Sequence, residues 1–187
     1  FGTPSHDVIG ATRYLSSGDV LDIGAGEGRH SIFLAEHGFH VVALEISSVA
    51  IERIQANAAE RGVTVDAREM DISHMSIDSQ YDVILTTYVL HHLQREVASK
   101  LLQQMKQQTR PDGLNHIALF TENSEFYKEN PKPNMFYPRS GELQELYADW
   151  EVLSFRERRA KLYQKKPDGS AMYSLVSEIL ARRPAHT

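Results

Sequence analysis

The chain has 187 residues, of which 41% are hydrophobic and 24% are charged, a composition typical of one globular domain with a substantial core. Its formal net charge is −5, so it offers no general basic surface for nucleic acid. No apolar run approaches the roughly 18 residues that a membrane-spanning helix requires. Because the sequence contains no cysteine, it excludes a disulfide and a thiolate metal site. These properties predict a single cytoplasmic domain over residues 1–187, with no nucleic-acid or membrane partner.

The first 18 residues are predicted to form a cap and a helix. Apolar residues between Val8 and Leu15 are spaced close to a helical period. Ser5 and Asp7 precede or open this pattern, and either side chain is of a type that caps a helix. We expect the helix to end by Gly18, where the next strand begins.

The second predicted unit is a strand, a glycine turn and a helix. The apolar run at residues 20–23 predicts a buried parallel strand, and a helical pattern runs from His30 to a glycine at position 38. Between them stand three glycines at alternate positions, Gly24, Gly26 and Gly28. Such a turn lets the backbone approach a ligand closely and directs free helix N–H groups toward it. The alternative is an ordinary tight turn between a strand and a helix.

The spacing of these glycines limits the class of ligand that the turn can bind. A dinucleotide site would need its third glycine one position later, where Arg29 stands, and a P-loop would need Lys followed by Ser or Thr. The pattern from Asp22 to Gly28 instead resembles motif I of class I S-adenosylmethionine-dependent methyltransferases. This resemblance implies that the glycine turn passes under the methionine part of the cofactor.

Two acids further along the chain stand where such a cofactor would need them. A second buried strand at residues 39–44 ends in Glu45, about 20 residues beyond the turn, where an acid can accept hydrogen bonds from both ribose hydroxyls. A helix from Ser48 to about Arg61 and a third strand at 63–67 lead to Asp71. The resemblance implies that Asp71 binds the adenine amino group. The alternatives are a surface acid at position 45 and a capping aspartate at position 71.

The fourth predicted strand, at residues 81–87, runs into Tyr88 and the pair His91 and His92. The Asn/Asp-Pro-Pro-aromatic motif of DNA and protein-glutamine N-methyltransferases is absent here, which argues against those substrates. Adjacent histidines on a helix point about 100° apart, and no acid or third histidine lies at ligand spacing. We therefore predict no metal site, and we assign one of the histidines to the wall of a pocket.

The rest of the chain completes the predicted fold. A helix at 97–109, a turn at 110–113 and a strand at 114–121 are followed by a long, irregular, lid-like loop at 122–139. A short helix then ends near Trp150, and strands at 151–159 and 172–182 flank a hairpin turn at 167–170. The alternation of strands and helices predicts a Rossmann-like, doubly wound sheet of seven mostly parallel strands, with helices on both faces and a C-terminal antiparallel hairpin.

The C-terminal third resembles one branch of this superfamily, the tellurite-resistance methyltransferases of the TehB type. The segments that carry the resemblance are residues 111–115, 141–143 with Tyr147 and Trp150, and 180–183; upstream, residues 28–31 and 81–87 match as well. In that family a His-Arg pair in the strand after Gly-Glu-Leu is proposed to handle the oxyanion substrate. Tyr163 and Gln164 stand at those positions here. Because a cationic pair has become neutral, a small oxyanion is a doubtful natural substrate.

The predicted function is methyl transfer from S-adenosylmethionine to a small-molecule acceptor, either tellurite-like or thiol-like, by a monomer or homodimer. The predicted cofactor contacts are Asp22, Gly24, Ala25, Gly26, Arg29, Glu45, Ile46, Asp71, Ile72, Thr87 and Val89. The predicted acceptor pocket is formed by Tyr88, His91, His92, Arg139 and Tyr163. No catalytic residue is assigned. The alternatives are a methyltransferase of RNA or protein, and a protein that binds S-adenosylmethionine without catalysis.

Overall fold

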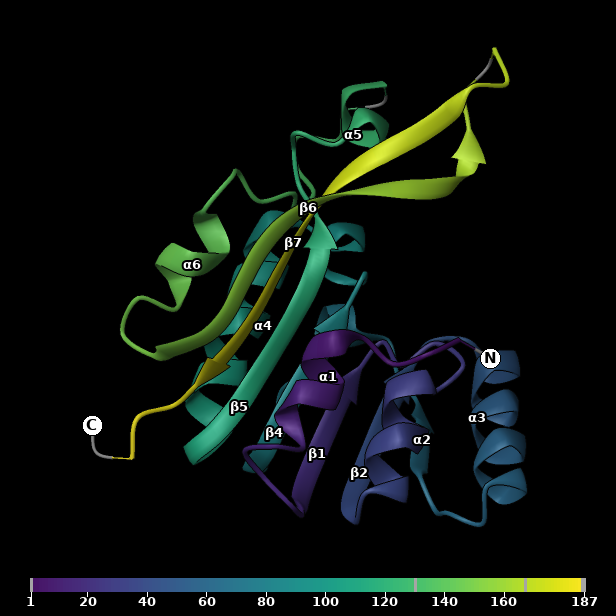
Figure 1. Ribbon diagram of the computed structural model, residues 1–187, viewed down its shortest axis with the longest axis vertical. Coiled ribbons are helices and arrows are strands. Elements are labelled where there is room, and N and C mark those ends of the chain that lie inside the picture. Colours follow the sequence, from purple (N-terminus) through teal and green to yellow (C-terminus); the bar gives the residue numbers. More distant parts are fainter. Residues whose placement is uncertain (1, 130, 167, 186–187) are drawn as a thin grey trace.

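The computed structural model describes residues 2–129, 131–166 and 168–185, apart from the side chains of residues 126, 163 and 164 (Figure 1). Seven strands form one sheet in the order β3-β2-β1-β4-β5-β7-β6. Their bounds are β1 Gly18–Ile23, β2 Phe39–Glu45, β3 Asp66–Glu69, β4 Tyr81–Thr87, β5 Thr109–Phe120, β6 Glu151–Lys165 and β7 Ala171–Arg182. The first five strands pair in parallel, whereas β7 runs antiparallel to both β5 and β6. The predicted doubly wound sheet with a terminal hairpin is confirmed.

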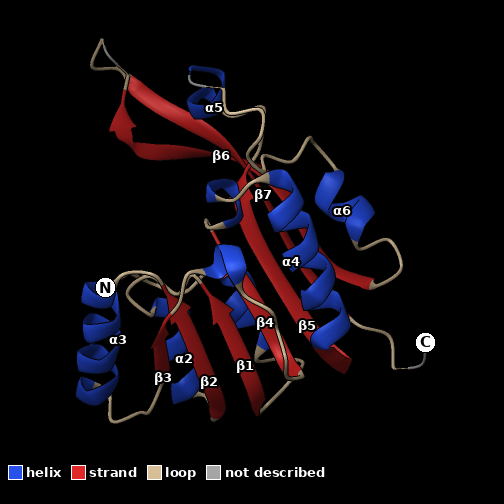
Figure 2. Cartoon of the chain, turned by 180° about the vertical axis from the view of Figure 1, so that it is seen from behind, coloured by secondary structure: helices blue, strands red, loops and turns tan. Residues whose placement is uncertain are grey.

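Helices cover both faces of the sheet (Figure 2). Helices α1 (His6–Ala11), α2 (Arg29–Glu36) and α3 (Ser48–Glu60) pack on one face, and α4 (Arg95–Gln108) packs on the other with α6 (Glu142–Leu146). Alternation along β1 produces the two cores, because neighbouring side chains on a strand point to opposite faces. Val20 packs under α1 to α3, and Leu21 and Ile23 pack under α4. None of the helices in the described ranges is long and apolar enough to cross a membrane.

The start of the chain agrees with the helix signal in the sequence. Ser5 is the N-cap of α1, and its hydroxyl accepts a hydrogen bond from the Val8 amide. Asp7, the other candidate cap, is buried and pairs with Arg156 on β6 at 2.8 Å. The structure therefore decides between two caps that local sequence left open.

Several segments differ from the sequence prediction. The third strand is shifted to Asp66–Glu69, an edge strand whose mostly exposed residues carry little apolar pattern. The predicted turn at 110–113 lies inside β5, where Asp112 has a left-handed φ of 62° and its amide donates to the Arg183 carbonyl. The last strand pair is also longer than predicted, because β6 extends to Lys165.

The segment predicted as an irregular lid is partly ordered. It contains the short helix α5 (Glu125–Glu129). Its C-terminal part is anchored to the core, where Phe136 is buried and its amide donates to the Leu93 carbonyl at 2.9 Å. These contacts hold the C-terminal part of the segment against the core, and its role as a lid stays a prediction.

Candidate active site

A cavity of about 650 Å³ opens at the C-terminal ends of β1, β2 and β4. The chain runs outward from β1 to β2 and β3, then returns to β4 on the other side of β1. Ligands of open α/β sheets bind at this kind of switch point. The cavity is lined by Gly24, Gly26, Glu45, Ile46, Met70, Asp71, Ile72, Ser73, Thr87, Tyr88, Val89, His92 and Leu93.

The glycine turn forms the floor between β1 and α2. Gly24 has a φ of 74°, and a Cβ built there would lie 2.2 Å from a Val89 methyl carbon, so internal packing requires this glycine. Gly26 has a φ of 57°, but a Cβ there would meet nothing within 4 Å. The absence of a side chain at Gly26 thus leaves open space beside the backbone, into which a ligand can fit.

Glu45 stands at the end of β2 with its carboxylate fixed by backbone donors. One carboxylate oxygen accepts from the Gly26 amide at 3.0 Å, and the other accepts from Ile46 and Ser47 at 2.9 and 3.1 Å. These bonds connect β2 to the glycine turn. They hold a negative charge at the edge of the cavity, and they also stabilise the turn itself.

The next wall combines Asp71 with exposed apolar side chains. The Asp71 carboxylate caps the 3₁₀ helix η1 (Ile72–His74) by accepting from the Ser73 amide and hydroxyl at 2.9 and 2.7 Å. These hydrogen bonds lower the pKa of Asp71. Ile46 is 64% exposed and Met70 39% exposed. Large apolar side chains without a protein partner at a cavity edge are typical of a ligand-binding surface.

The opposite wall is formed by the segment after β4. Tyr88 has a left-handed φ of 60°, and its ring packs on Phe120 with the centroids 5.3 Å apart. His92 lines the cavity, and partial burial lowers the pKa of its imidazole. His91 points into the core instead, where burial lowers its pKa to about 3 and its Nδ1 has no hydrogen-bond partner. Of the two histidines, only His92 is placed to meet a ligand.

Several residues predicted for the site do not line this cavity. Asp22 lies behind the turn, fully buried, and accepts a hydrogen bond from the Ser31 hydroxyl at 2.6 Å. Burial raises the pKa of Asp22 to about 6. Ala25 and Arg29 belong to the turn and to α2, outside the lining. All three residues lie beside the cavity, and their role as cofactor contacts stays a prediction.

Arg139 was predicted to lie in the acceptor pocket, but it does not line the cavity. Its guanidinium bonds to Glu145 of α6, with one contact at 2.8 Å, and it borders a separate surface hollow with Arg95, Glu122 and Glu142. The Glu145 carboxylate on α6 therefore holds the Arg139 side chain away from the cavity. The Tyr163 side chain lies outside the described part of the structure, as does that of Gln164.

Other lining residues were missed by the sequence analysis. Met70 and Ser73 flank the predicted pair Asp71 and Ile72, so proximity in sequence could have indicated them. Leu93 follows His92 at the end of η2 (Leu90–His92), where its apolar character alone indicates a core position.

The strand order and the antiparallel end of the sheet define the class I methyltransferase fold. The profile of one family with this fold, described as "Tellurite resistance protein TehB", matches residues 2–175, and the chain belongs to this TehB family. The resemblance found in the sequence is thus confirmed.

Similar proteins agree with this assignment. The "Probable S-adenosyl-L-methionine-dependent methyltransferase TehB" of Haemophilus influenzae is 28% identical over 177 residues, covering 95% of this chain and 61% of the relative. The crystal structure of TehB from Haemophilus influenzae superposes with a TM-score of 0.84 at 27% identity, covering 96% of this chain and 62% of that one. The chain therefore spans about three fifths of the length of these relatives.

A more distant structure shows the fold alone. The N-methyltransferase NodS from Bradyrhizobium japonicum, in complex with S-adenosyl-L-homocysteine, gives a TM-score of 0.67 at 15% identity. The superposition covers 95% of this chain and 84% of the NodS chain.

Proposed function

We propose that this chain binds S-adenosylmethionine and transfers its methyl group to a small-molecule acceptor. The observation that carries the proposal is that one cavity brings together the glycine turn, the Glu45 carboxylate and the Asp71 wall. Membership of the TehB family and the name of the Haemophilus influenzae relative support the same reaction.

The chemistry of the cavity fits each part of this cofactor. The open space at Gly26 admits a chain lying close to the backbone, and the Glu45 carboxylate suits the two ribose hydroxyls. Ile46 and Ile72 offer apolar surface for a planar base, and Asp71 offers an acceptor for an exocyclic amine. We propose these five residues as the principal cofactor contacts, with Gly24, Thr87 and Val89 completing the pocket.

When bound, the cofactor would supply a methyl group on a positively charged sulfur. The bond from the acceptor to the methyl carbon would form as the carbon–sulfur bond breaks, and the neutral thioether would leave with the electron pair. The chain's own residues then need to align the acceptor and exclude water, rather than stabilise a strongly charged transition state. Tyr88, His92 and Leu93 are placed to form the acceptor side of the cavity. No metal or covalent intermediate is required.

The nature of the acceptor decides whether a base is needed. A thiol reacts as its thiolate, which forms by loss of the proton to water, so the site need not supply a base. For an oxygen or nitrogen acceptor we propose His92, because it lines the cavity and its lowered pKa leaves the imidazole neutral and able to accept a proton at neutral pH. The neighbouring His91 is shielded in the core and is not placed to act as this base.

Calorimetry with S-adenosylhomocysteine and NAD tests the cofactor, and we expect only the former to bind. Turnover with a methyl-labelled donor on thiols, small oxyanions, RNA and protein then tests the reaction. Transfer to RNA or protein alone would support the alternative substrates, and binding without transfer to any of them would indicate a non-catalytic protein. NAD binding without S-adenosylhomocysteine binding would overturn the proposal.

A further inference from the structure

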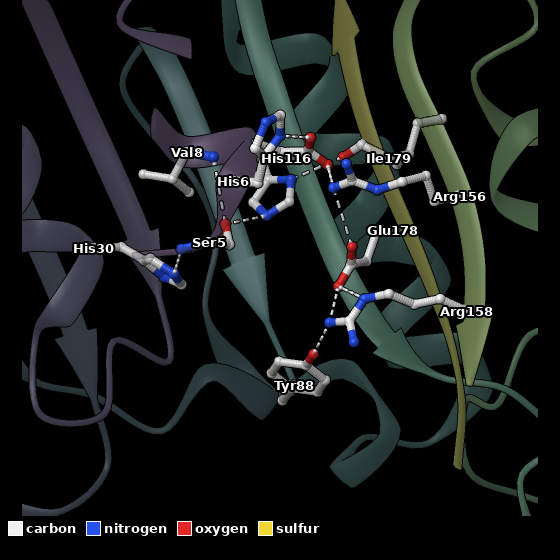
Figure 3. Close-up of polar contacts among 11 residues, drawn as sticks. Ser5, His6, Val8, His30, Tyr88, His116, Arg156, Arg158, Glu178 and Ile179 are labelled. Carbon is white, nitrogen blue, oxygen red and sulfur yellow. Dashed lines mark hydrogen bonds and ion pairs between the residues drawn. The ribbon is translucent and has the colours of Figure 1, made fainter. Parts of the chain in front are cut away.

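One arginine that the sequence analysis did not single out reaches the acceptor side of the cavity. Arg158 lies on β6, and its Nη2 approaches the Tyr88 hydroxyl at 3.4 Å (Figure 3). Tyr88 lines the cavity, so its side chain connects the cavity wall to the terminal hairpin. The left-handed backbone of Tyr88 is costly for a residue with a Cβ, and such strain tends to persist at functional sites.

A buried carboxylate fixes the direction of Arg158. Glu178 of β7 is 5% exposed, and one of its oxygens accepts from Arg158 Nε and Nη2 at 3.1 and 2.7 Å (Figure 3). Its other oxygen pairs with Arg156 at 3.2 Å, and Arg156 in turn pairs with Asp7. The Arg158 side chain nevertheless remains 48% exposed, and its Nη1 makes no hydrogen bond to any described residue.

The charged groups that act on the Tyr88 phenol are Glu178, Arg158 and Arg29. Arg29 also interacts with the buried Asp22 carboxyl, which leaves Arg158 as the cation in direct contact with the Tyr88 hydroxyl. Burial, followed by Glu178, raises the pKa of Tyr88. The phenol therefore keeps its proton and can donate it in a hydrogen bond.

We propose that Arg158 and Tyr88 select an acceptor that carries a carboxylate or similar anionic group, joined by an apolar or aromatic body to its nucleophilic atom. The free Nη1 edge of a guanidinium suits a carboxylate. The rings of Tyr88 and His92 line the cavity and provide the surface for the body, and Phe120 supports the Tyr88 ring. Because Arg158 lies at the hydroxyl end of Tyr88 and does not itself line the cavity, a small inorganic oxyanion held in the cavity is too short to reach it. This inference rests on the proposed function, since it names the substrate class of the same site.

A matched pair of aryl thiols tests the inference, because each loses its proton to water and its thiolate needs no base from the site. The acid is 4-mercaptobenzoate and its uncharged isostere is 4-mercaptobenzamide, and the measurement is the ratio of their kcat/KM values for S-methylation. We expect the wild-type chain to favour the acid at least tenfold, and Arg158→Gln to bring the ratio close to one. Arg158→Lys should give an intermediate ratio, because it keeps the charge but loses the planar fork.

Arg182→Gln is the matched control. Arg182 bonds to Glu151 across the same strand pair, as Arg158 does to Glu178, but lies at the end of the pair where β6 begins. This variant should retain the wild-type ratio, and calorimetry with S-adenosylhomocysteine checks that each variant is folded.

A second readout does not depend on turnover. Benzoate should bind the wild-type complex with S-adenosylhomocysteine at least tenfold more tightly than benzamide, and Arg158→Gln should remove this difference. Equal responses to acid and amide in the wild-type chain, or a preference that survives Arg158→Gln, would overturn the inference. A failure to bind S-adenosylhomocysteine at all would overturn the proposed function instead.

Discussion

At the scale of single residues, Asp22 connects the glycine turn to the pH dependence of stability. Its carboxyl is fully buried, and this burial raises its pKa to about 6. The folded chain therefore binds this proton more tightly than the unfolded chain, in which the pKa is about 3.9. The stabilising contribution is complete below pH 4 and is lost as the pH rises to about 6. Above pH 6 the buried carboxyl is ionised, which lowers the free energy of unfolding by on the order of 3 kcal/mol.

Asp22→Asn should remove this pH dependence. The amide keeps the shape of the side chain and an oxygen that can accept from Ser31, but carries no charge. In the absence of cofactor we expect the variant to be roughly 1–3 kcal/mol more stable than the wild-type chain at pH 8, and no more stable at pH 4. Urea unfolding across this range measures the difference. Asp66→Asn, at an exposed carboxylate, is the control, and an equal gain for Asp22→Asn at every pH would contradict the account.

Glu45→Ala should weaken the binding of S-adenosylhomocysteine by tenfold or more. Charge-assisted hydrogen bonds are worth about 1.5–3 kcal/mol each, and two of them to a ribose would exceed a factor of ten in affinity. Calorimetry measures the affinity. The matched control is Glu69→Ala, because Glu69 is the register partner of Glu45 at the end of β3 but does not line the cavity. If a folded Glu45→Ala variant kept its affinity, the carboxylate would not bind the cofactor and would only stabilise the turn.

At the scale of elements, two glycines of the same turn have different roles. Packing against Val89 requires Gly24, whereas Gly26 leaves space for a ligand. Gly26→Ala places a methyl group in the open space of the cavity, at a backbone angle that costs about 1–2 kcal/mol for alanine. We expect this loss of stability together with at least a tenfold loss of S-adenosylhomocysteine affinity.

Gly62→Ala is the control for backbone strain in this experiment. Gly62 follows α3 with a φ of 67° and also has nothing near its missing Cβ, but it does not line the cavity. Thermal unfolding should shift similarly in both variants, and only Gly26→Ala should lose affinity. If both variants kept full affinity, the open space at Gly26 would not be the place of the cofactor.

At the scale of the whole molecule, we propose that the terminal hairpin of β6 and β7 determines which acceptor the chain takes. The TehB resemblance places a neutral pair, Tyr163 and Gln164, where that family has His-Arg. A buried anion without a positive partner is costly. We therefore predict lower activity of the wild-type chain on tellurite or selenite than on an organic thiol, measured as methyl transfer from a labelled donor.

The double substitution Tyr163→His with Gln164→Arg should raise activity on tellurite while S-adenosylhomocysteine affinity stays unchanged. The single substitution Tyr163→Phe serves as its control, because it adds no charge. Efficient methylation of tellurite by the wild-type chain, without improvement in the double variant, would show that other residues hold the substrate.

The sequence by itself determined the elements whose signals are local. Apolar runs predicted β1, β2 and β4, because a buried parallel strand needs an apolar side chain at nearly every position. The order of strands and helices then predicted the sheet topology, and the glycine spacing predicted the turn at the cavity. The edge strand β3 was misplaced because its exposed residues carry no such pattern.

Only the tertiary structure decided which side chains meet. Arg158 reaches Tyr88, 70 residues away in sequence, because the pairing of β6 with β7 and of β7 with β5 carries it there. His91 and His92 are equivalent in sequence, and packing alone turns one into the core and the other toward the cavity. Arg139 faces Glu145 rather than the cavity for the same reason. Local pattern fixes the backbone of an element, but the direction of a polar side chain depends on partners that distant segments bring to it.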